Sequence, residues 1–210
     1  MPPTITATDR PLEKLSADAV VVAIGKGREG ILPTPGAEAV DRLMGGKLLP
    51  ALADLGARGA EDEVTRLASF GQGPFPVVAA AGLGAPEADG TYGTEAIRRA
   101  AGAASRALAG RGSVVSLLAA VGGSPDTERL YAVGEGSLLG AYEFTAYKSD
   151  LPADRPTPPS EFTVVVPGAA AAETPLQRVR AVARALRPEY ERRSSRGLRL
   201  EPLPTARMPP

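Results

Sequence analysis

The chain has 210 residues, 43% of them hydrophobic, which is enough for one generous domain with a sizeable core. Its 24 basic and 24 acidic residues cancel, so no global charge favours nucleic acid or an anionic membrane as partner. It contains no Cys and no His, which excludes disulfides, thiol nucleophiles, zinc fingers and every imidazole-based mechanism.

The first third of the chain predicts two strands followed by a broken helix. Residues Thr4–Thr8 read as a short edge strand, and the apolar run Ala19–Ile24 reads as a strand buried on both faces. The next stretch has helical periodicity that is interrupted at Gly45, Gly46 and Pro50, so a broken helix is expected. The start of the chain lacks a secretory signal and no apolar run reaches membrane-spanning length, so we expect a cytoplasmic protein.

The middle of the chain continues the alternation of strands and helices. Val64–Phe70 and Pro76–Ala81 read as two strands joined by a Gly/Pro turn. An amphipathic helix follows that carries Arg99 and Arg106 on its polar face and stops at Gly110. Its apolar stripe consists of Ile97, Ala100, Ala101, Ala104 and Leu108.

A further buried strand begins at Ser113, and the helix after it is expected to start with Ser124 as N-cap and Pro125 at its first position and to end near Lys148. After a Pro-rich connector come a strand in "FTVVVPG" and a helix with Leu176, Val179, Val182 and Leu186 in phase. This order predicts an α/β fold, with a mixed, largely parallel sheet flanked by helices on both faces.

Two glycine-rich turns are weak candidates for phosphate binding. "GLG" at Gly82–Gly84 follows a strand, but a loop follows it where a dinucleotide fingerprint would open a helix. "GKGREG" at Gly25–Gly30 lacks the spacing and the Lys-Ser/Thr ending of a P-loop. Plain turn geometry is the favoured interpretation of both.

Acidic and serine candidates are weaker still. "EDE" at Glu61–Glu63 and the pair Asp126 and Glu128 could hold a metal, but a strand entry and a helix N-terminus favour solvated or dipole-complementing roles. Ser137 in "GEGS" resembles a nucleophile elbow superficially, yet the pattern lacks its final glycine and no His could activate it. No residue of this chain is therefore predicted to be catalytic or to bind a metal or cofactor.

The stretch "VGEGSLLGAYEFTAYKSD" places Gly136, Gly140 and Tyr147 on one narrow helical stripe. Each glycine inside a helix costs about 1 kcal/mol relative to alanine, so we expect another backbone to approach closely there. Glu135, Leu139 and Glu143 lie on the opposite side, and Leu139 suggests an interface edge.

The same stretch resembles the segment that ends the N-terminal domain of leucyl (cytosol) aminopeptidases. Gly136, Gly140, Tyr142, Phe144, Tyr147, Lys148 and Ser149 fit that family's pattern. The order of the other segments fits over residues 1–186, which we assign to this macro-domain-like, non-catalytic domain. Residues 187–210 depart from the family as an Arg/Pro-rich tail that we expect to be disordered, which suggests a truncated or frame-shifted gene product.

The resemblance implies an N-terminal domain whose family hydrolyses N-terminal residues, leucine preferentially, from peptides. In the family, a following catalytic domain binds two divalent metals (zinc, manganese or magnesium) through Asp, Glu and Lys. The motif "NTDAEGRL" of that domain is absent here, so no catalytic residue is carried over and the chain is expected to be inactive alone. A homo-oligomer, or assembly with full-length aminopeptidase subunits, is the implied partnership.

Two alternatives remain open at this point. One is a stand-alone regulatory module that binds a full-length aminopeptidase or, less favoured, nucleic acid, since the arginines of the tail lack an ordered aromatic platform. The other is a macro-type binder of ADP-ribose, which rests on fold analogy alone.

Overall fold

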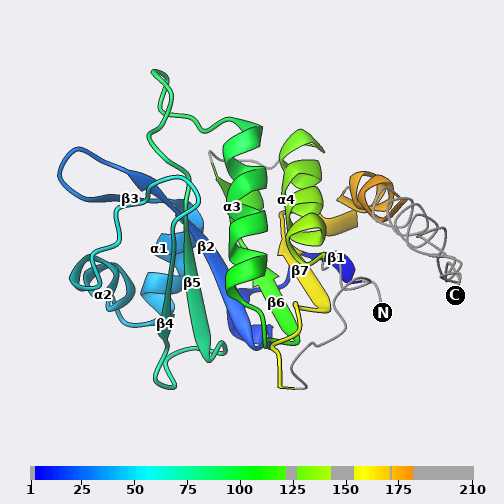
Figure 1. Cartoon of the computed structure of the whole chain (residues 1–210), viewed down its shortest axis with the longest axis horizontal. Helices are drawn as coiled ribbons and strands as arrows, with labels where there is room; N and C mark the ends of the chain where they lie inside the picture. The colour runs from blue at the N-terminus through cyan, green and yellow to red at the C-terminus, as the bar shows by residue number, and fades with distance from the viewer. Residues whose placement is uncertain (1–2, 122–126, 143–153, 171, 182–210) are drawn as a thin grey trace, which may run out of the picture.

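The computed structural model describes residues 3–121, 127–142, 154–170 and 172–181, which form a seven-stranded sheet between layers of helices (Figure 1). Five strands run parallel to one another. Two further strands are antiparallel: β3 (Ile31–Pro33) pairs with β2 (Ala19–Lys26), and β4 (Val64–Ala68) pairs with β5 (Val77–Gly82). The order across the sheet is β1 (Thr4–Thr8), β7 (Glu161–Val165), β6 (Ser113–Ser116), β2 (Ala19–Lys26), β5 (Val77–Gly82) and β4 (Val64–Ala68). The predicted mixed, largely parallel sheet is confirmed, with Thr4–Thr8 as an edge strand.

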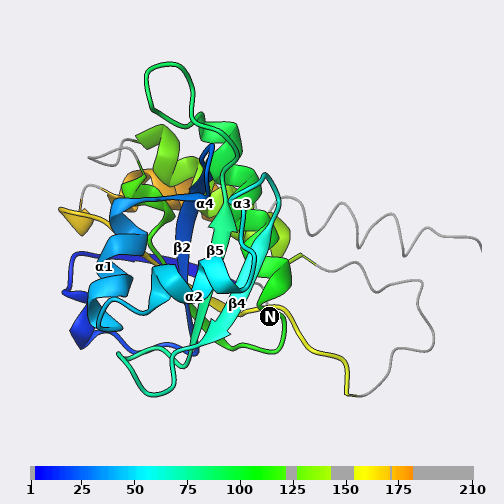
Figure 2. The ribbon, with the colours of Figure 1, turned by 90° about the vertical axis from the view of Figure 1, so that its left-hand side faces the viewer.

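Helices cover both faces of this sheet (Figures 1 and 2). One face packs against α1 (Pro35–Leu43) and α2 (Leu48–Asp54), and the other against α3 (Thr94–Ala107), α4 (Thr127–Gly140) and the helical residues 172–181. Two short 3₁₀ turns, η1 (Leu12–Lys14) and η2 (Leu118–Ala120), complete the described elements.

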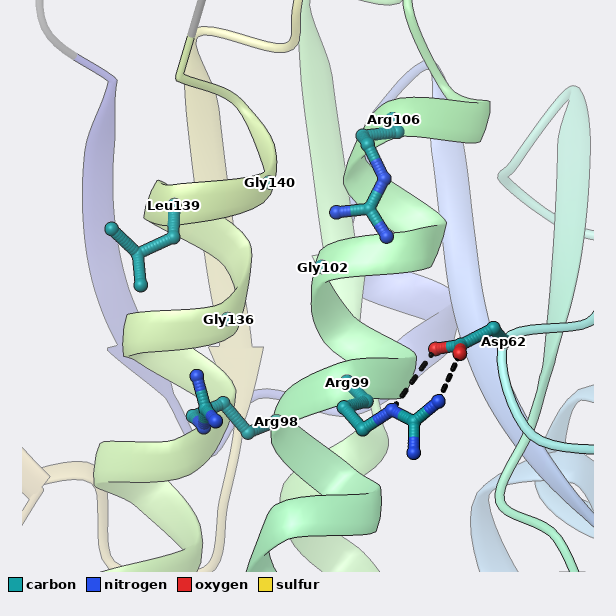
Figure 3. Close-up of a pocket in the computed structure, with 8 residues that line it drawn as sticks. All are labelled: Asp62, Arg98, Arg99, Gly102, Arg106, Gly136, Leu139 and Gly140. Atoms are coloured by element: carbon teal, nitrogen blue, oxygen red, sulfur yellow. Dashed lines mark hydrogen bonds and ion pairs between the residues drawn. The ribbon is translucent and has the colours of Figure 1, made fainter.

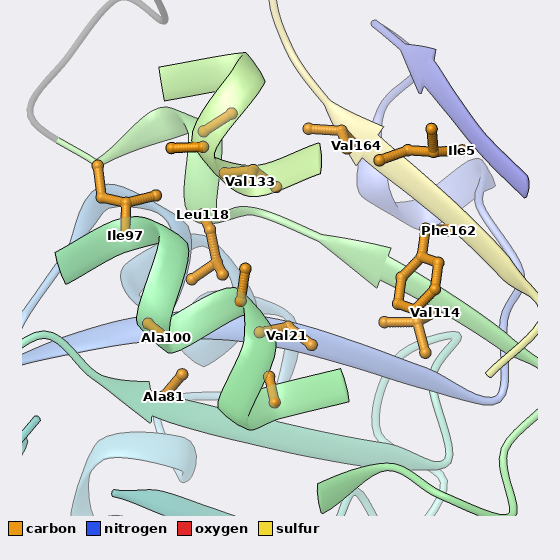
Figure 4. Packing of buried hydrophobic residues seen from close by; sticks show 14 of the residues in the cluster. Ile5, Val21, Ala81, Ile97, Ala100, Val114, Leu118, Val133, Phe162 and Val164 are labelled. Atoms are coloured by element: carbon orange, nitrogen blue, oxygen red, sulfur yellow. The ribbon is translucent and has the colours of Figure 1, made fainter. Parts of the chain in front are cut away.

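The pleat of the central strand divides the core into two clusters. On β2, Val20 and Val22 face the α1–α2 side, whereas Val21 and Ala23 face the α3–α4 side. All four are at most 3% exposed, because a central parallel strand is covered on both faces. Figure 4 shows the α3–α4 cluster, in which Val21 lies beneath the helices.

The outer helix 172–181 is fixed to both α4 and the edge strand. Leu176 and Val179 are buried, and the side chain of Val179 lies against Gly134 of α4. The Arg180 guanidinium donates to the carbonyl oxygen of Ile5 on β1 at 2.6 and 2.9 Å. A charged donor thus satisfies a carbonyl of the edge strand.

Several local expectations differ from the structure. The helix break occurs at Gly45 and Gly46, both at positive φ, but Pro50 lies in the first turn of α2, where proline is tolerated. The sequence predicted that the helix would continue to near Lys148, and this is wrong for Ala141 and Tyr142, which are not helical. Helix α4 ends at Gly140, and glycine has low helix propensity.

Other expectations lie outside the described residues. These are the cap at Ser124 and Pro125, positions 143–149 of the family-like stretch, Val182 and Leu186 of the last helix, and the tail 187–210. Across the part of the chain that is described, no helix is both long enough and apolar enough to cross a membrane.

Candidate functional site

The carboxyl ends of β2 and β5, where open α/β sheets usually bind ligands, are covered by the chain's own loop 57–63. This loop approaches so closely that a side chain at Gly59 would overlap the carbonyl of Gly25, and one at Gly82 would overlap that of Ala60. The glycines at this edge therefore make room for the protein's own backbone.

The "GLG" turn has no amide left for an anion. Each of its three N–H groups donates to a carbonyl oxygen: Gly82 to Glu63 at 2.8 Å, Leu83 to Ile24 at 2.9 Å and Gly84 to Gly59 at 2.9 Å. A phosphate cradle needs free amides that converge on one point. The structure thus supports the plain turn interpretation of Gly82–Gly84.

The second glycine-rich turn is closed as well. Gly27 donates to the carbonyl of Gly30 at 2.8 Å, which closes the hairpin between β2 and β3. The phenol of Tyr92 lies directly over Gly25, in the space that a side chain there would occupy. Burial of this ring raises the pKa of Tyr92.

The acidic candidates have structural roles. The Glu63 carboxylate accepts from the backbone amides of Arg58 at 3.1 Å and Ala60 at 2.8 Å, which holds the covering loop. Glu61 and Asp62 both pair with Arg99. Asp126 lies outside the described residues, and among those described no group of three or more His, Cys, Asp or Glu could hold a metal ion.

Ser137 lies in the last turn of α4 and is only 3% exposed. A nucleophile must reach its substrate, and the elbow of an esterase sits on a strand-to-helix turn. The structure therefore agrees with the exclusion of Ser137 as a nucleophile.

Helices α3 and α4 touch through their backbones. A side chain at Gly136 would overlap the carbonyl oxygen of Arg98, and a Cβ at Gly140 would lie 2.5 Å from the carbonyl oxygen of Gly102. The predicted close approach of another backbone at Gly136 and Gly140 is therefore confirmed.

A groove of about 470 Å³ opens on the outer side of this helix pair. Figure 3 shows its floor of helix backbone and its charged side chains, with Arg98 reaching from α3 toward α4 below Gly136. Its lining consists of Asp62, Arg98, Arg99, Gly102, Arg106, Gly136, Leu139 and Gly140.

Two of the three arginines in the groove are held by carboxylates. Arg98 donates to Glu95 at 2.7 and 2.9 Å, and hydrogen bonding with Glu95 raises the pKa of Arg98. Arg99 binds Asp62 and Glu61, and the hydrogen bond with Asp62 raises the pKa of Arg99. Both guanidinium groups are thus held in direction by these carboxylates.

The sequence anticipated only part of this groove. It placed Leu139 at an exposed edge opposite the glycines; Leu139 is 40% exposed, but it lines the same groove as Gly136 and Gly140, because residues three apart on a helix share a side. It placed Arg99 and Arg106 on a polar face but did not group them with Leu139 or include Arg98. The spacing of the three arginines along one helix could have indicated that they lie close together. Nothing in the sequence indicates that α4 lies beside them.

Comparison with known proteins shows which protein family this chain resembles. Residues 19–151 match the family described as "Cytosol aminopeptidase family, N-terminal domain". A probable cytosol aminopeptidase of Micrococcus luteus is 45% identical over 184 residues, which are 86% of this chain and 34% of that protein. The chain thus spans about a third of the length of this relative.

Solved structures share the fold. A mutant of tomato leucine aminopeptidase matches 88% of this chain and 36% of its own, with a TM-score of 0.64 and 17% identity. An Oceanobacillus iheyensis macrodomain mutant matches 87% of this chain and 92% of its own, with a TM-score of 0.57 and 16% identity. The bottromycin maturation enzyme BotP in complex with Mn matches 80% of this chain and 30% of its own, with a TM-score of 0.54 and 24% identity.

Proposed function

Because this chain belongs to the cytosol aminopeptidase family through that family's N-terminal domain, we propose that it is the non-catalytic domain of a leucyl aminopeptidase-type metallo-exopeptidase and does not hydrolyse peptides by itself. The match of residues 19–151 to the N-terminal domain carries this proposal. The length of the Micrococcus luteus relative supports it, since about two thirds of that protein lie outside the match.

The carboxylates of the described region do not fit a two-metal centre. Two-metal hydrolysis needs several carboxylates converging on ions about 3.5–4 Å apart. Here Glu63 holds two backbone amides, while Glu61 and Asp62 are paired with Arg99. No step of peptide hydrolysis is therefore assigned to these residues.

The expected context is an assembly in the cytoplasm. The relatives are named cytosol aminopeptidases, and the exposed groove on α3 and α4 offers a surface for a protein neighbour. We propose contact with further copies of the chain or with full-length aminopeptidase subunits.

An assay of the purified 210-residue chain tests the non-catalytic role. With leucine p-nitroanilide and added Mn²⁺, we expect no turnover above the blank, because the described residues bring together no group of three or more acids that could hold a metal ion. The full-length Micrococcus luteus relative, assayed in parallel, controls for substrate and metal. Turnover by the folded chain that a chelator abolishes would contradict the proposal.

A further inference from the structure

Strand β1, at one edge of the sheet (Figure 1), contains no charged residue. It reads Thr4–Thr8, with Ile5 and Ala7 between the threonines. The amide of Thr4 and the carbonyl of Thr8 both bond toward β7. Because the direction alternates along a strand, the backbone N–H and C=O groups of Ile5 and Ala7 point away from the sheet. An uncharged edge of this kind is a template for another strand.

The strand is also complementary to a second copy of itself. In an antiparallel pair with its two-fold axis at Thr6, Ile5 of one copy lies opposite Ala7 of the other, and Thr4 lies opposite Thr8. Ile5 and Ala7 are the residues whose backbone groups point outward, so they would exchange both N–H···O bonds of such a pair. Threonine pairs across strands are favourable, and β1 has no charges that would repel one another.

The side chain of Arg180 occupies the acceptor at the centre of this edge. Its guanidinium donates to the Ile5 carbonyl at 2.6 and 2.9 Å, the oxygen that the Ala7 amide of a second copy would need. The same guanidinium donates to Glu173 at 2.6 Å, and this hydrogen bond lowers the pKa of Glu173. Within the described ranges, the other outward groups of Ile5 and Ala7 have no hydrogen-bond partner. Arg180 therefore supplies the only hydrogen bonds seen on this edge.

The opposite edge differs because β4 carries its own charge. Arg66 lies at the centre of β4, and its guanidinium donates to the carbonyl of Ala107, the last residue of α3. A second copy paired antiparallel about Arg66 would place two arginines opposite each other, which disfavours pairing. Strand β1 lacks such a residue, so the charge at its edge has to come from another element.

We propose that Arg180 is a latch that keeps β1 from pairing with β1 of a second copy, so that docking of helix 172–181 controls self-assembly through this edge. While the guanidinium holds the Ile5 carbonyl, a second strand finds its acceptor occupied and a charged side chain in its path. Release of the helix frees the outward groups of both copies for a strand pair. The inference goes beyond the proposed function, because it requires neither peptidase activity nor an aminopeptidase subunit.

Sedimentation velocity and hydrogen exchange of the full chain test the latch. Arg180→Gln removes the charged donor and should associate more strongly than the wild type as the concentration rises. The amides of Ile5 and Ala7, followed by NMR, should then exchange about tenfold more slowly, because each gains a hydrogen bond. Arg178→Gln is the matched control, since Arg178 lies on the same helix over the ring of Tyr131 and should associate as the wild type does.

Two further variants make the test decisive. Glu173→Gln loosens the hold on Arg180 without touching β1, so association should rise to a smaller extent. Thr6→Lys, added to Arg180→Gln, places charges where the two strands would face each other and should return the mass to the wild-type value.

The inference is overturned if folded Arg180→Gln associates no more than Arg178→Gln, or if the amides of β1 exchange equally fast in both. Association that Thr6→Lys does not reverse would use another surface and would overturn it too. Leu176 and Val179 remain to bury the helix in these variants. Should Arg180→Gln still fail to fold, wild-type association of Glu173→Gln counts against the latch.

Discussion

Phe70 lies at the tip of the turn between β4 and β5 and is 89% exposed. Its φ of 53° places it in the left-handed region, which costs an L-residue with a side chain about 1–2 kcal/mol. Its neighbours hold the turn: the backbone amide of Ser69 donates to the Pro76 carbonyl at 3.0 Å, and the backbone amide of Gln72 donates to the Ser69 carbonyl at 3.0 Å. The phenyl ring therefore contributes no burial to offset its backbone strain.

Replacing Phe70 by Asn should stabilise the protein. Asparagine tolerates the left-handed conformation, so we expect the free energy of unfolding to rise by about 1 kcal/mol in urea denaturation. Phe70→Ala is the matched control, because it removes the ring but keeps the strain, and it should change stability little. Equal free energies of unfolding for the two variants would show that the backbone at Phe70 is not strained.

At the scale of elements, the packing of the α3–α4 pair depends on particular residues. Its contact depends on Gly136 and Gly140, where the backbone of α3 fills the space of a side chain. Gly102, on the facing helix, is different, since a Cβ there would meet its nearest neighbours at an ordinary 3.4 Å. We therefore expect substitution by alanine to affect stability differently at Gly136 and Gly140 than at Gly102.

Gly136→Ala should destabilise the protein by about 1–3 kcal/mol, as overpacked cores do, although alanine is the better helix former. Gly102→Ala should be neutral or slightly stabilising, because it gains helix propensity without a clash. Thermal or urea unfolding of the two variants makes the comparison. A stabilised Gly136→Ala would show that the helices can move apart at no cost.

At the scale of the whole molecule, the fold is shared with a macrodomain, but the usual ligand edge is closed. Loop 57–63 covers the ends of β2 and β5, the amides of Gly82–Gly84 are used, and Tyr92 fills the space over Gly25. A ligand at this edge would have to displace backbone hydrogen bonds as well as the half-buried ring of Tyr92.

We therefore expect the chain not to bind ADP-ribose. Calorimetric titration of the 210-residue chain should give only the heat of dilution, with an ADP-ribose-binding macrodomain as positive control. Saturable heat that Tyr92→Trp abolished would contradict this expectation, because the larger ring would then block a real site.

Much of the fold follows from local pattern. Runs such as Ala19–Ile24 and the stripe of α3 that begins at Ile97 encode strand and helix through the period of their apolar residues. The close packing at Gly136 could also be predicted, because a glycine inside a helix needs a reason. The end of α4 could not, since the periodicity of 133–150 continues past the residue where the helix stops.

The sequence by itself determined the α/β class, the buried strands, the helix stripes and the likeness to an N-terminal aminopeptidase domain, because these depend on residues near one another in the chain. Only the tertiary structure decided that the amide of Gly84 meets the carbonyl of Gly59, that Asp62 reaches Arg99, and that Leu139 shares a groove with Arg106. These are contacts between separate elements, and they depend on how the elements pack rather than on any local period.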